Sequence, residues 1–475
     1  MSKLIRIYST VILALLFALF LSGFANAEEA KPEPQVPAPQ APATQVPPAP
    51  QAASTQPPPE TAGQNTGNKL TLEEAINMAL PGHPKVQAAT QDLRAGQFNT
   101  LGVQATFWPQ ITFDANRNYV WSQRLVRIGS TTVTTAANYV ANNFTFNGNW
   151  TLFDFGRTYY SVKSSRSLED SLRDNLSLSE QTVAYDIMDA YYNVLKAQSL
   201  VKVAHETLDD ANKHLSQAQA FYEVGTKPKF DVTQAEVQVN NAKVLVIQSE
   251  DAVRAALVNL NTRIGIDPLA PTEVVDRPDL ETLDKPLDYY LQQALESRQD
   301  LKSLEDVLRS NEMLVRSRFA GFLPIISTSA SYNWYKEDHS DFLTNSGVIL
   351  AADIPIFEGF RTVASVGQAR ATVLSNKYRI EDAKNDILNQ VGISYIAIED
   401  SRASVDALKV SVKSARENLD IANGRYEAGV GAILDVTDAQ VSLTSAEANL
   451  AQAFYNYHLA YSKLLRNIGA SPRNQ

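Results

Sequence analysis

Two phrases of this sequence combine tyrosine, glycine and aspartate at matching positions, which makes them the first candidates for a functional site. The phrases are FYEVGTKPKFDVTQAEV, which begins at Phe221, and RYEAGVGAILDVTDAQV, which begins at Arg425. When they are aligned, four pairs of residues coincide: Tyr222 with Tyr426, Gly225 with Gly429, Asp231 with Asp435 and Thr233 with Thr437. Because glycine tolerates a left-handed backbone, each phrase predicts a helix end, a tight turn and a second helix.

The aspartates of both phrases open the second helix, where a carboxylate interacts favourably with the free N–H groups of the first turn. Asp231 with Gln234 fits an N-cap pair. Asp435 and Asp438 are three residues apart, so they lie on one face of their helix. Capping accounts for all three carboxylates, and a further role stays open.

Patterns of catalytic or metal-binding residues are absent from the sequence. The five histidines are scattered along the chain: His83, His205, His214, His339 and His458. No metal-ligand spacing, nucleophile elbow or phosphate-binding glycine loop is present. The chain has no cysteine, which excludes disulfides, thiolate metal sites and a lipid-modified N-terminal cysteine. We therefore expect no enzyme, no cofactor and no metal site.

The composition indicates a secreted globular protein. The chain has 475 residues, 44% of them hydrophobic, and a net charge of −10, which argues against a nucleic-acid partner.

Lys3 and Arg6 precede a short apolar run, and small residues follow, so residues 1–27 are expected to be a cleaved signal peptide. Residues 28–68, rich in Pro, Ala and Gln, are expected to form a disordered tether. No later stretch is apolar for long enough to form a transmembrane helix.

The repeated phrase belongs to a unit that occurs twice, over residues 69–266 and 285–470. Residues 267–284 link the two repeats, and residues 471–475 form a tail. The first repeat opens with a helix whose N-terminus has a capping box, Thr71 with Glu74. In each repeat this helix is expected to run to an aromatic-proline stop, at Pro109 and Pro324.

Apolar and polar residues alternate after each of these prolines, which predicts β-hairpins over 110–154 and 325–357. We expect polar connections at 124–142 and 336–346. The strands are apolar or aromatic on one face and rich in Ser and Asn on the other. Trp121, Trp150 and Trp334 fit a girdle at a membrane interface or packing between strands equally well.

Helical periodicity returns after each hairpin, over 156–264 and 360–468. Apolar residues recur every 3.5 residues on both sides of the repeated phrase, often with a large residue alternating with alanine. This spacing predicts paired helices with coiled-coil packing. The helix before each turn would be on the order of 100 Å long.

Four amphipathic strands cannot close a barrel, because membrane barrels generally need about eight strands or more. Since open edges in lipid leave backbone groups without partners, several chains must pool their strands. With the secretion signal and the long helices, this predicts a conduit from the outer membrane into the periplasm.

The ordered set of duplicated phrases resembles the TolC family of outer-membrane efflux channels, the outer membrane efflux proteins, from Leu70 to Ala470. The phrases that carry the resemblance are LTLEEAINMAL, LFDFGR with IFEGFR, and the two turn phrases. The resemblance implies a homotrimer with a 12-stranded outer-membrane β-barrel, continued by a 12-helix periplasmic α-barrel. It also implies partners: a periplasmic adaptor (membrane fusion) protein, an inner-membrane transporter and outer-membrane lipid.

The same resemblance assigns roles at the turns. Gly225 and Gly429 match the tips that contact the adaptor. Asp435 and Asp438 match the two aspartates that ring the periplasmic entrance and would form a cation-attracting constriction in a trimer. Three residues match the links that hold the entrance closed: Asp231, Tyr222 and Tyr426. The family pattern has an arginine two residues after the second tip glycine, and here that residue is Gly431, while the first turn offers Lys227 and Lys229 instead. A salt-bridge lock of that form is therefore in doubt.

We expect the exit duct of a tripartite efflux or type I secretion system, passively exporting small molecules or proteins. The alternative is a secreted coiled-coil scaffold or adhesin without a pore, which would have no reason to alternate Phe, Trp and Ile on one face of four strands. A periplasmic enzyme would need a polar constellation that the sequence does not contain. The exported substrate, the choice between efflux and protein secretion, and the identity of the adaptor and pump are not specified by these residues.

Overall fold

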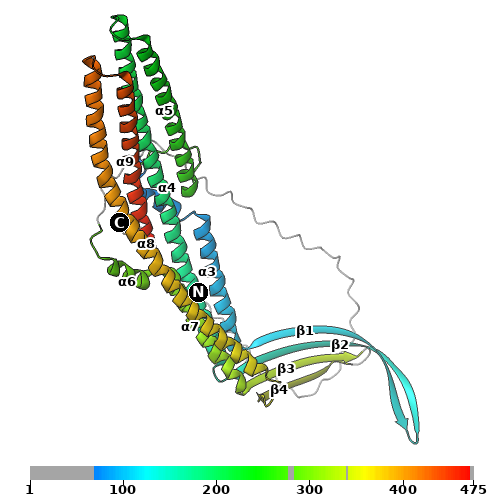
Figure 1. The fold of residues 1–475 in the computed structure, drawn as a ribbon. Coiled ribbons are helices and arrows are strands. Elements are labelled where there is room, and N and C mark those ends of the chain that lie inside the picture. The colour runs from blue at the N-terminus through cyan, green and yellow to red at the C-terminus, as the bar shows by residue number, and fades with distance from the viewer. Residues whose placement is uncertain (1–68, 276–282, 338–340, 471–475) are drawn as a thin grey trace, which may run out of the picture. The chain divides into compact units, whose positions relative to one another are not determined.

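The structure is a computed structural model that describes residues 69–275, 283–337 and 341–470. The expected signal peptide, tether and C-terminal tail lie outside the described residues, as do His339 and part of the inter-repeat linker. The two helix–hairpin–helix–helix repeats that the sequence predicts are both present in the part of the chain that is described (Figure 1).

Each repeat opens with two helices in place of the single one expected from the sequence. In the first repeat, α2 (Leu72–Ala79) ends before Pro81, and α3 (Pro84–Gln104) begins with proline at its first position. Proline can start a helix but cannot continue one, which explains the break. In the second repeat, α6 (Leu287–Ser297) and α7 (Gln299–Phe319) are separated by the extended residue Arg298.

The predicted capping box at the start of α2 is confirmed. The Glu74 N–H donates to Thr71 Oγ1 at 3.3 Å, and the Thr71 N–H donates to Glu74 Oε2 at 3.0 Å. These two bonds satisfy N–H groups that the first helical turn leaves without partners.

One antiparallel sheet combines the hairpins of both repeats in the order β1-β2-β3-β4. Its strands are β1 (Gln110–Ile128), β2 (Thr131–Phe153), β3 (Ile325–Glu337) and β4 (Leu343–Asp353). The expected polar connection over 124–142 is wrong, because β1 and β2 stay paired up to a turn at Gly129. Backbone pairing does not require apolar side chains, so this hairpin continues beyond its last pair with β3, Ala141 with Glu337.

Strand register places the predicted aromatic residues on one face. Phe113 lies opposite Phe146, which in turn lies opposite Tyr332. The Phe113 and Phe146 rings are 4.7 Å apart, yet both side chains remain about half exposed, at 54% and 44%. The other face is polar, with Asn147 Nδ2 donating to Asp114 Oδ2 at 2.9 Å. The sheet thus has an uncovered apolar face and a hydrogen-bonded polar face.

Four long helices carry the repeated phrases. They are α4 (Arg157–Glu223), α5 (Lys229–Ile264), α8 (Arg361–Glu427) and α9 (Ile433–Asn467). α4 packs along α5, and α8 packs along α9, as two helical hairpins (Figure 1). Alanines spaced by seven residues are buried along α4, at 204, 211 and 218, which confirms the predicted heptad seam. α4 and α8 each have 67 residues, so each is roughly 100 Å long.

The main hydrophobic core lies where the two repeats meet in the middle of the helices. It includes Ile187, Val194, Val391 and Leu464, all fully buried. The described part of the linker runs beside the start of the first repeat, where Val274 forms a parallel bridge with Leu70. The buried Tyr191 hydroxyl donates to the Val275 carbonyl oxygen at 2.6 Å.

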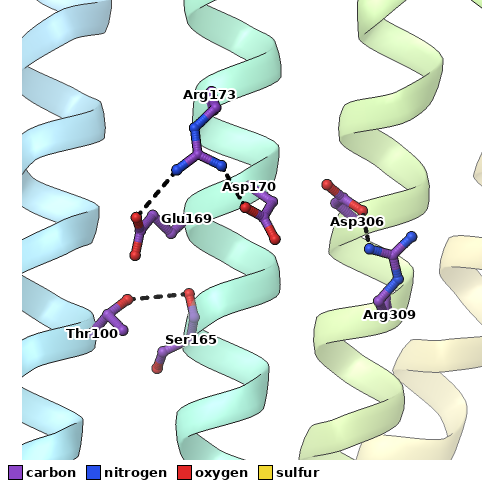
Figure 2. A network of polar contacts seen from close by, with 7 residues as sticks. All are labelled: Thr100, Ser165, Glu169, Asp170, Arg173, Asp306 and Arg309. Atoms are coloured by element: carbon purple, nitrogen blue, oxygen red, sulfur yellow. Dashed lines mark hydrogen bonds and ion pairs between the residues drawn. The ribbon is translucent and has the colours of Figure 1, made fainter.

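Polar contacts join α4 to the helices on either side of it. Three serine pairs bridge α4 and α7, with Oγ–Oγ distances of 2.8 to 2.9 Å: Ser161 with Ser317, Ser164 with Ser310, and Ser171 with Ser303. Such small residues let two helix backbones approach closely. Figure 2 shows Thr100 on α3 donating to the Ser165 carbonyl oxygen, with the ion pairs of Arg173 and Arg309 beside it. Both arginines pair with carboxylates of their own helix.

Among the helices of the described residues, none has an apolar stretch long enough to cross a membrane.

Candidate functional site at the helix tips

Both repeated phrases form the same turn. The Gly225 N–H donates to the Tyr222 carbonyl oxygen at 2.9 Å, and the Thr226 N–H donates to that of Phe221 at 2.9 Å. In the second repeat, Gly429 and Val430 donate to the carbonyl oxygens of Tyr426 and Arg425 at 3.1 and 3.0 Å. This is the Schellman arrangement, which satisfies the last carbonyl groups of a helix.

The backbone at each tip is left-handed, with φ of +73° at Gly225 and +76° at Gly429. Glycine is required there because residues with a Cβ rarely adopt this conformation. Nothing lies within 4 Å of a Cβ placed on either glycine, so both tips have open space on that side. The turn therefore fixes the backbone while leaving room for another chain to approach.

A buried hydrogen bond joins the two tips. The Tyr426 hydroxyl donates to Asp231 Oδ2 at 3.0 Å, and these side chains are only 1% and 7% exposed. The Phe221 ring packs edge-on against Tyr426 with the centroids 5.7 Å apart. Burial, followed by the hydrogen bond to Asp231, raises the pKa of Tyr426, so the hydroxyl keeps its proton.

The predicted N-cap role of Asp231 is wrong. Helix α5 begins at Lys229 with Pro228 as its N-cap residue, so Asp231 lies within the first turn. Its carboxylate faces Tyr426 of the other repeat. The N-cap prediction placed the helix start at Asp231 and did not use Pro228, which stands directly before the first helical residue.

The hydrogen bond between Tyr426 and Asp231 does not involve the other predicted gate residues, Tyr222, Asp435 and Asp438. Tyr222 is 47% exposed, although it occupies the position equivalent to the buried Tyr426. The exposed Asp435 accepts the Ala432 N–H at 3.3 Å, which fits a capping role at the start of α9. Asp438 is exposed one turn further along α9, so both carboxylates are open to solvent in a single chain.

Lys227 and Gly431 form a second connection between the tips, a pairing of these two residues that the sequence did not predict. Lys227 Nζ donates to the Gly431 carbonyl oxygen at 3.3 Å and lies 4.6 Å from the centroid of the Tyr426 ring. The only available signal was that both residues stand two positions after a tip glycine.

Polar residues away from the tips contact neighbouring side chains of the fold. A cleft of about 880 Å³ lies where α4, α7, α8 and α9 meet, and Arg298 in its wall pairs with Asp300 at 2.6 Å. His458 is buried and stacks on Tyr192 with the ring centroids 5.0 Å apart. In the described part of the chain, no group of three or more potential ligands could hold a metal ion.

Solved structures with the same fold are outer-membrane channels. The structure of CusC, a protein that undergoes transmembrane channel formation, matches 86% of this chain and 96% of its own, with a TM-score of 0.75 at 18% identity. This chain therefore shares the fold of these proteins, an amphipathic four-stranded sheet joined to long helical hairpins with matched tips.

The chain belongs to the outer membrane efflux protein family, whose model matches residues 75–265 and 290–470. It is 26% identical over 410 residues to the alkaline protease secretion protein AprF of Pseudomonas aeruginosa, covering 83% of each chain. It is also 26% identical over 301 residues to the outer membrane protein TolC of Escherichia coli, covering 58% of this chain and 59% of that one. The resemblance found in the sequence is confirmed, and the protein is an outer-membrane export channel that extends into the periplasm.

Proposed function

We propose that this protein is the exit duct of a tripartite efflux or type I secretion system, through which small molecules or proteins leave passively. The observation that carries this proposal is the four-stranded sheet, apolar on one face, polar on the other and open at both edges. We further propose that three copies complete the duct as a homotrimer. β1 of one copy would pair with β4 of the next, giving twelve strands with the aromatic face toward lipid.

The two repeats would contribute equivalently to the helical part of the duct. We propose residues 69–266 and 285–470 as the structural halves, joined by residues 267–284. Each half supplies one helical hairpin, so three copies would enclose the passage with twelve helices.

The tips would dock on a periplasmic adaptor protein served by an inner-membrane transporter that supplies the energy. Open space beside Gly225 and Gly429 supports this role, because a second backbone can approach a glycine closely. The protein itself would perform no catalysis and need no cofactor, and the family is one of channels. The name of AprF refers to secretion of an alkaline protease, which makes a protein substrate a possibility to test here.

The gate would lie at the same tips. In a trimer, Asp435 and Asp438 would form a ring of carboxylates around the entrance, attracting cations. The links that hold the entrance closed would be Asp231 with Tyr426 inside each copy and Tyr222 at the exposed side of the first tip.

Planar-bilayer recording on the purified full-length protein tests the duct directly. We expect discrete unitary currents, and a mass in detergent that corresponds to three copies. A stable single copy without unitary currents would refute the duct and favour a scaffold.

Crosslinking in cells tests the docking surface. We expect mild crosslinking to recover an adaptor and an inner-membrane transporter, and substitution of both tip glycines by alanine to reduce that recovery. Gly265→Ala is the matched control, because Gly265 also has a left-handed backbone (φ +88°) with nothing near its Cβ position, and it caps the end of α5 opposite the tip. Equal recovery from the tip variant and the control would argue against docking at the tips.

A further inference from the structure

We propose that Lys227 is a gating residue that latches the tip of the second repeat onto the tip of the first within one copy of the chain. Neither the family pattern nor the proposed links include it. The proposal rests on the proposed gate, and it adds a residue whose loss should loosen both tips together.

The contacts of Lys227 span the two repeats. Its Nζ atom donates to the carbonyl oxygen of Gly431 at 3.3 Å and lies over the ring of Tyr426 at 4.6 Å. Tyr426 in turn holds Asp231 by a buried hydrogen bond, so one ammonium group contacts the outer side of the same link. A cation over an aromatic ring and a charge-assisted hydrogen bond are both attractive, more so where water is partly excluded.

Lys227 is suited to this role because its long side chain reaches across the gap from a half-buried position. The next lysine, Lys229, is exposed, and its backbone carbonyl oxygen accepts a hydrogen bond from the Thr233 hydroxyl at 3.2 Å. The two lysines carry the same charge on the same tip, so the second provides a control for the first.

Gly431 supplies the acceptor because it has no side chain. Its N–H donates to the Arg425 carbonyl oxygen at 2.9 Å, which holds this residue against the end of α8. A Cβ at this position would lie 3.0 Å from both the Arg425 carbonyl carbon and the Tyr426 nitrogen. Because backbone atoms cannot yield as a flexible side chain can, any larger residue would displace the segment and its carbonyl group.

The two residues are equivalents in the duplicated phrase. Lys227 stands two residues after Gly225, and Gly431 stands two residues after Gly429. The Lys227 N–H also donates back to Phe221, as the Gly431 N–H does to Arg425. The backbones therefore match, while one repeat provides a long cation and the other provides a bare carbonyl group.

Hydrogen exchange of the tip amides, followed by mass spectrometry, tests the latch in the full-length protein. We expect Lys227→Met to speed exchange in both tips, residues 221–231 and 425–435, by roughly threefold to tenfold, in line with one charge-assisted contact at a half-buried site. Lys229→Met should leave exchange unchanged. Lys227→Arg, which keeps the charge and the reach, should stay close to wild type.

A double variant separates a latch from two unrelated defects. Gly431→Ala should speed exchange to a similar extent, and combining it with Lys227→Met should add little. In bilayers, the same variants should open fully more often than wild type. Wild-type exchange rates in Lys227→Met, or additive effects in the double variant, would overturn the latch. Absence of currents from every variant would count against the duct, whereas the exchange rates decide the latch independently.

Discussion

Removing one hydroxyl group from Tyr426 should open the entrance. Tyr426→Phe deletes the donor to Asp231 but keeps the ring that contacts Phe221 and Lys227. Because both partners are more than nine-tenths buried, the Asp231 carboxylate would lose a hydrogen bond that water does not readily replace.

The size of this effect follows from the burial of the bond. A hydrogen bond to a charged group contributes about 1.5 to 3 kcal/mol when it is buried. Since about 1.4 kcal/mol corresponds to a factor of ten, the closed arrangement of each tip pair should weaken by roughly tenfold to a hundredfold. The wild-type link should also be insensitive to moderately alkaline conditions. The pKa of Tyr426 lies above its ordinary value of 10, so its contribution is full below that value and is lost only as the pH rises through the higher, folded-state pKa.

The assay is single-channel recording of Tyr426→Phe, Asp231→Ala and the double variant at pH 7 and pH 9. We expect each single variant to spend more time fully open and the double variant to resemble Asp231→Ala, since both changes break one bond. Equal open times in wild type and Tyr426→Phe would refute the reasoning. So would a wild-type channel that opens between pH 7 and pH 9, because the tyrosine should remain protonated there.

Three further predictions concern other polar groups of the helices. Replacing Asp435 and Asp438 by alanine should weaken block by divalent cations several-fold in bilayer recordings, because the proposed ring would lose its charge. Ser171→Ala alone should lower the free energy of unfolding by about 1 to 3 kcal/mol, because the buried Ser303 hydroxyl loses its partner. The double variant with Ser303→Ala should have nearly the wild-type free energy of unfolding, since no buried hydroxyl is then left unpaired. Asp189→Asn should raise the melting temperature at pH 7. Burial raises the pKa of Asp189, so its carboxyl favours folding below the ordinary value of 3.8 and this contribution is lost as the pH rises; the gain from asparagine should therefore fade in acid.

Controls distinguish these causes from general damage. Asp420→Ala removes an exposed carboxylate of α8 that lies before the tip and should leave divalent block unchanged. Block of equal strength in the aspartate variants and wild type would exclude the ring. A double serine variant as unstable as the sum of its single variants, or a gain from asparagine that persists below pH 4, would contradict the other two predictions.

Local periodicity predicted most of the fold. The strand register confirms the alternation predicted along β1 to β4, and the buried alanines confirm the heptad spacing predicted along α4 and α8. Both patterns depend on which face of an element is apolar. The errors arose where backbone geometry prevailed over side-chain pattern. Strand pairing continued through the polar residues before and after Gly129, and Pro81 with Pro84 divided a helix that apolar spacing had joined.

The site was less predictable, because equivalent residues in the two repeats have different neighbours. Tyr222 and Tyr426 share the same local sequence, yet one is exposed and the other is buried against Asp231. The tyrosine that contacts an aspartate is decided by which helical hairpin packs beside it. That packing depends on the whole tertiary structure and cannot be read from the local sequence. Lys227 was visible as a charge, but its acceptor is a backbone oxygen, which no sequence motif reveals.

The order of the strands has a consequence for biogenesis. Among the residues that the structure describes, β1 and β4 each lack a neighbouring strand on one side, so a row of their backbone groups has no strand to pair with. Water can solvate that row, whereas in hydrocarbon each such group costs several kcal/mol. If three copies complete the barrel as proposed, insertion depends on encounters between copies. The amount of chain synthesised, more than its hydrophobicity, would then set how much finished channel the membrane receives.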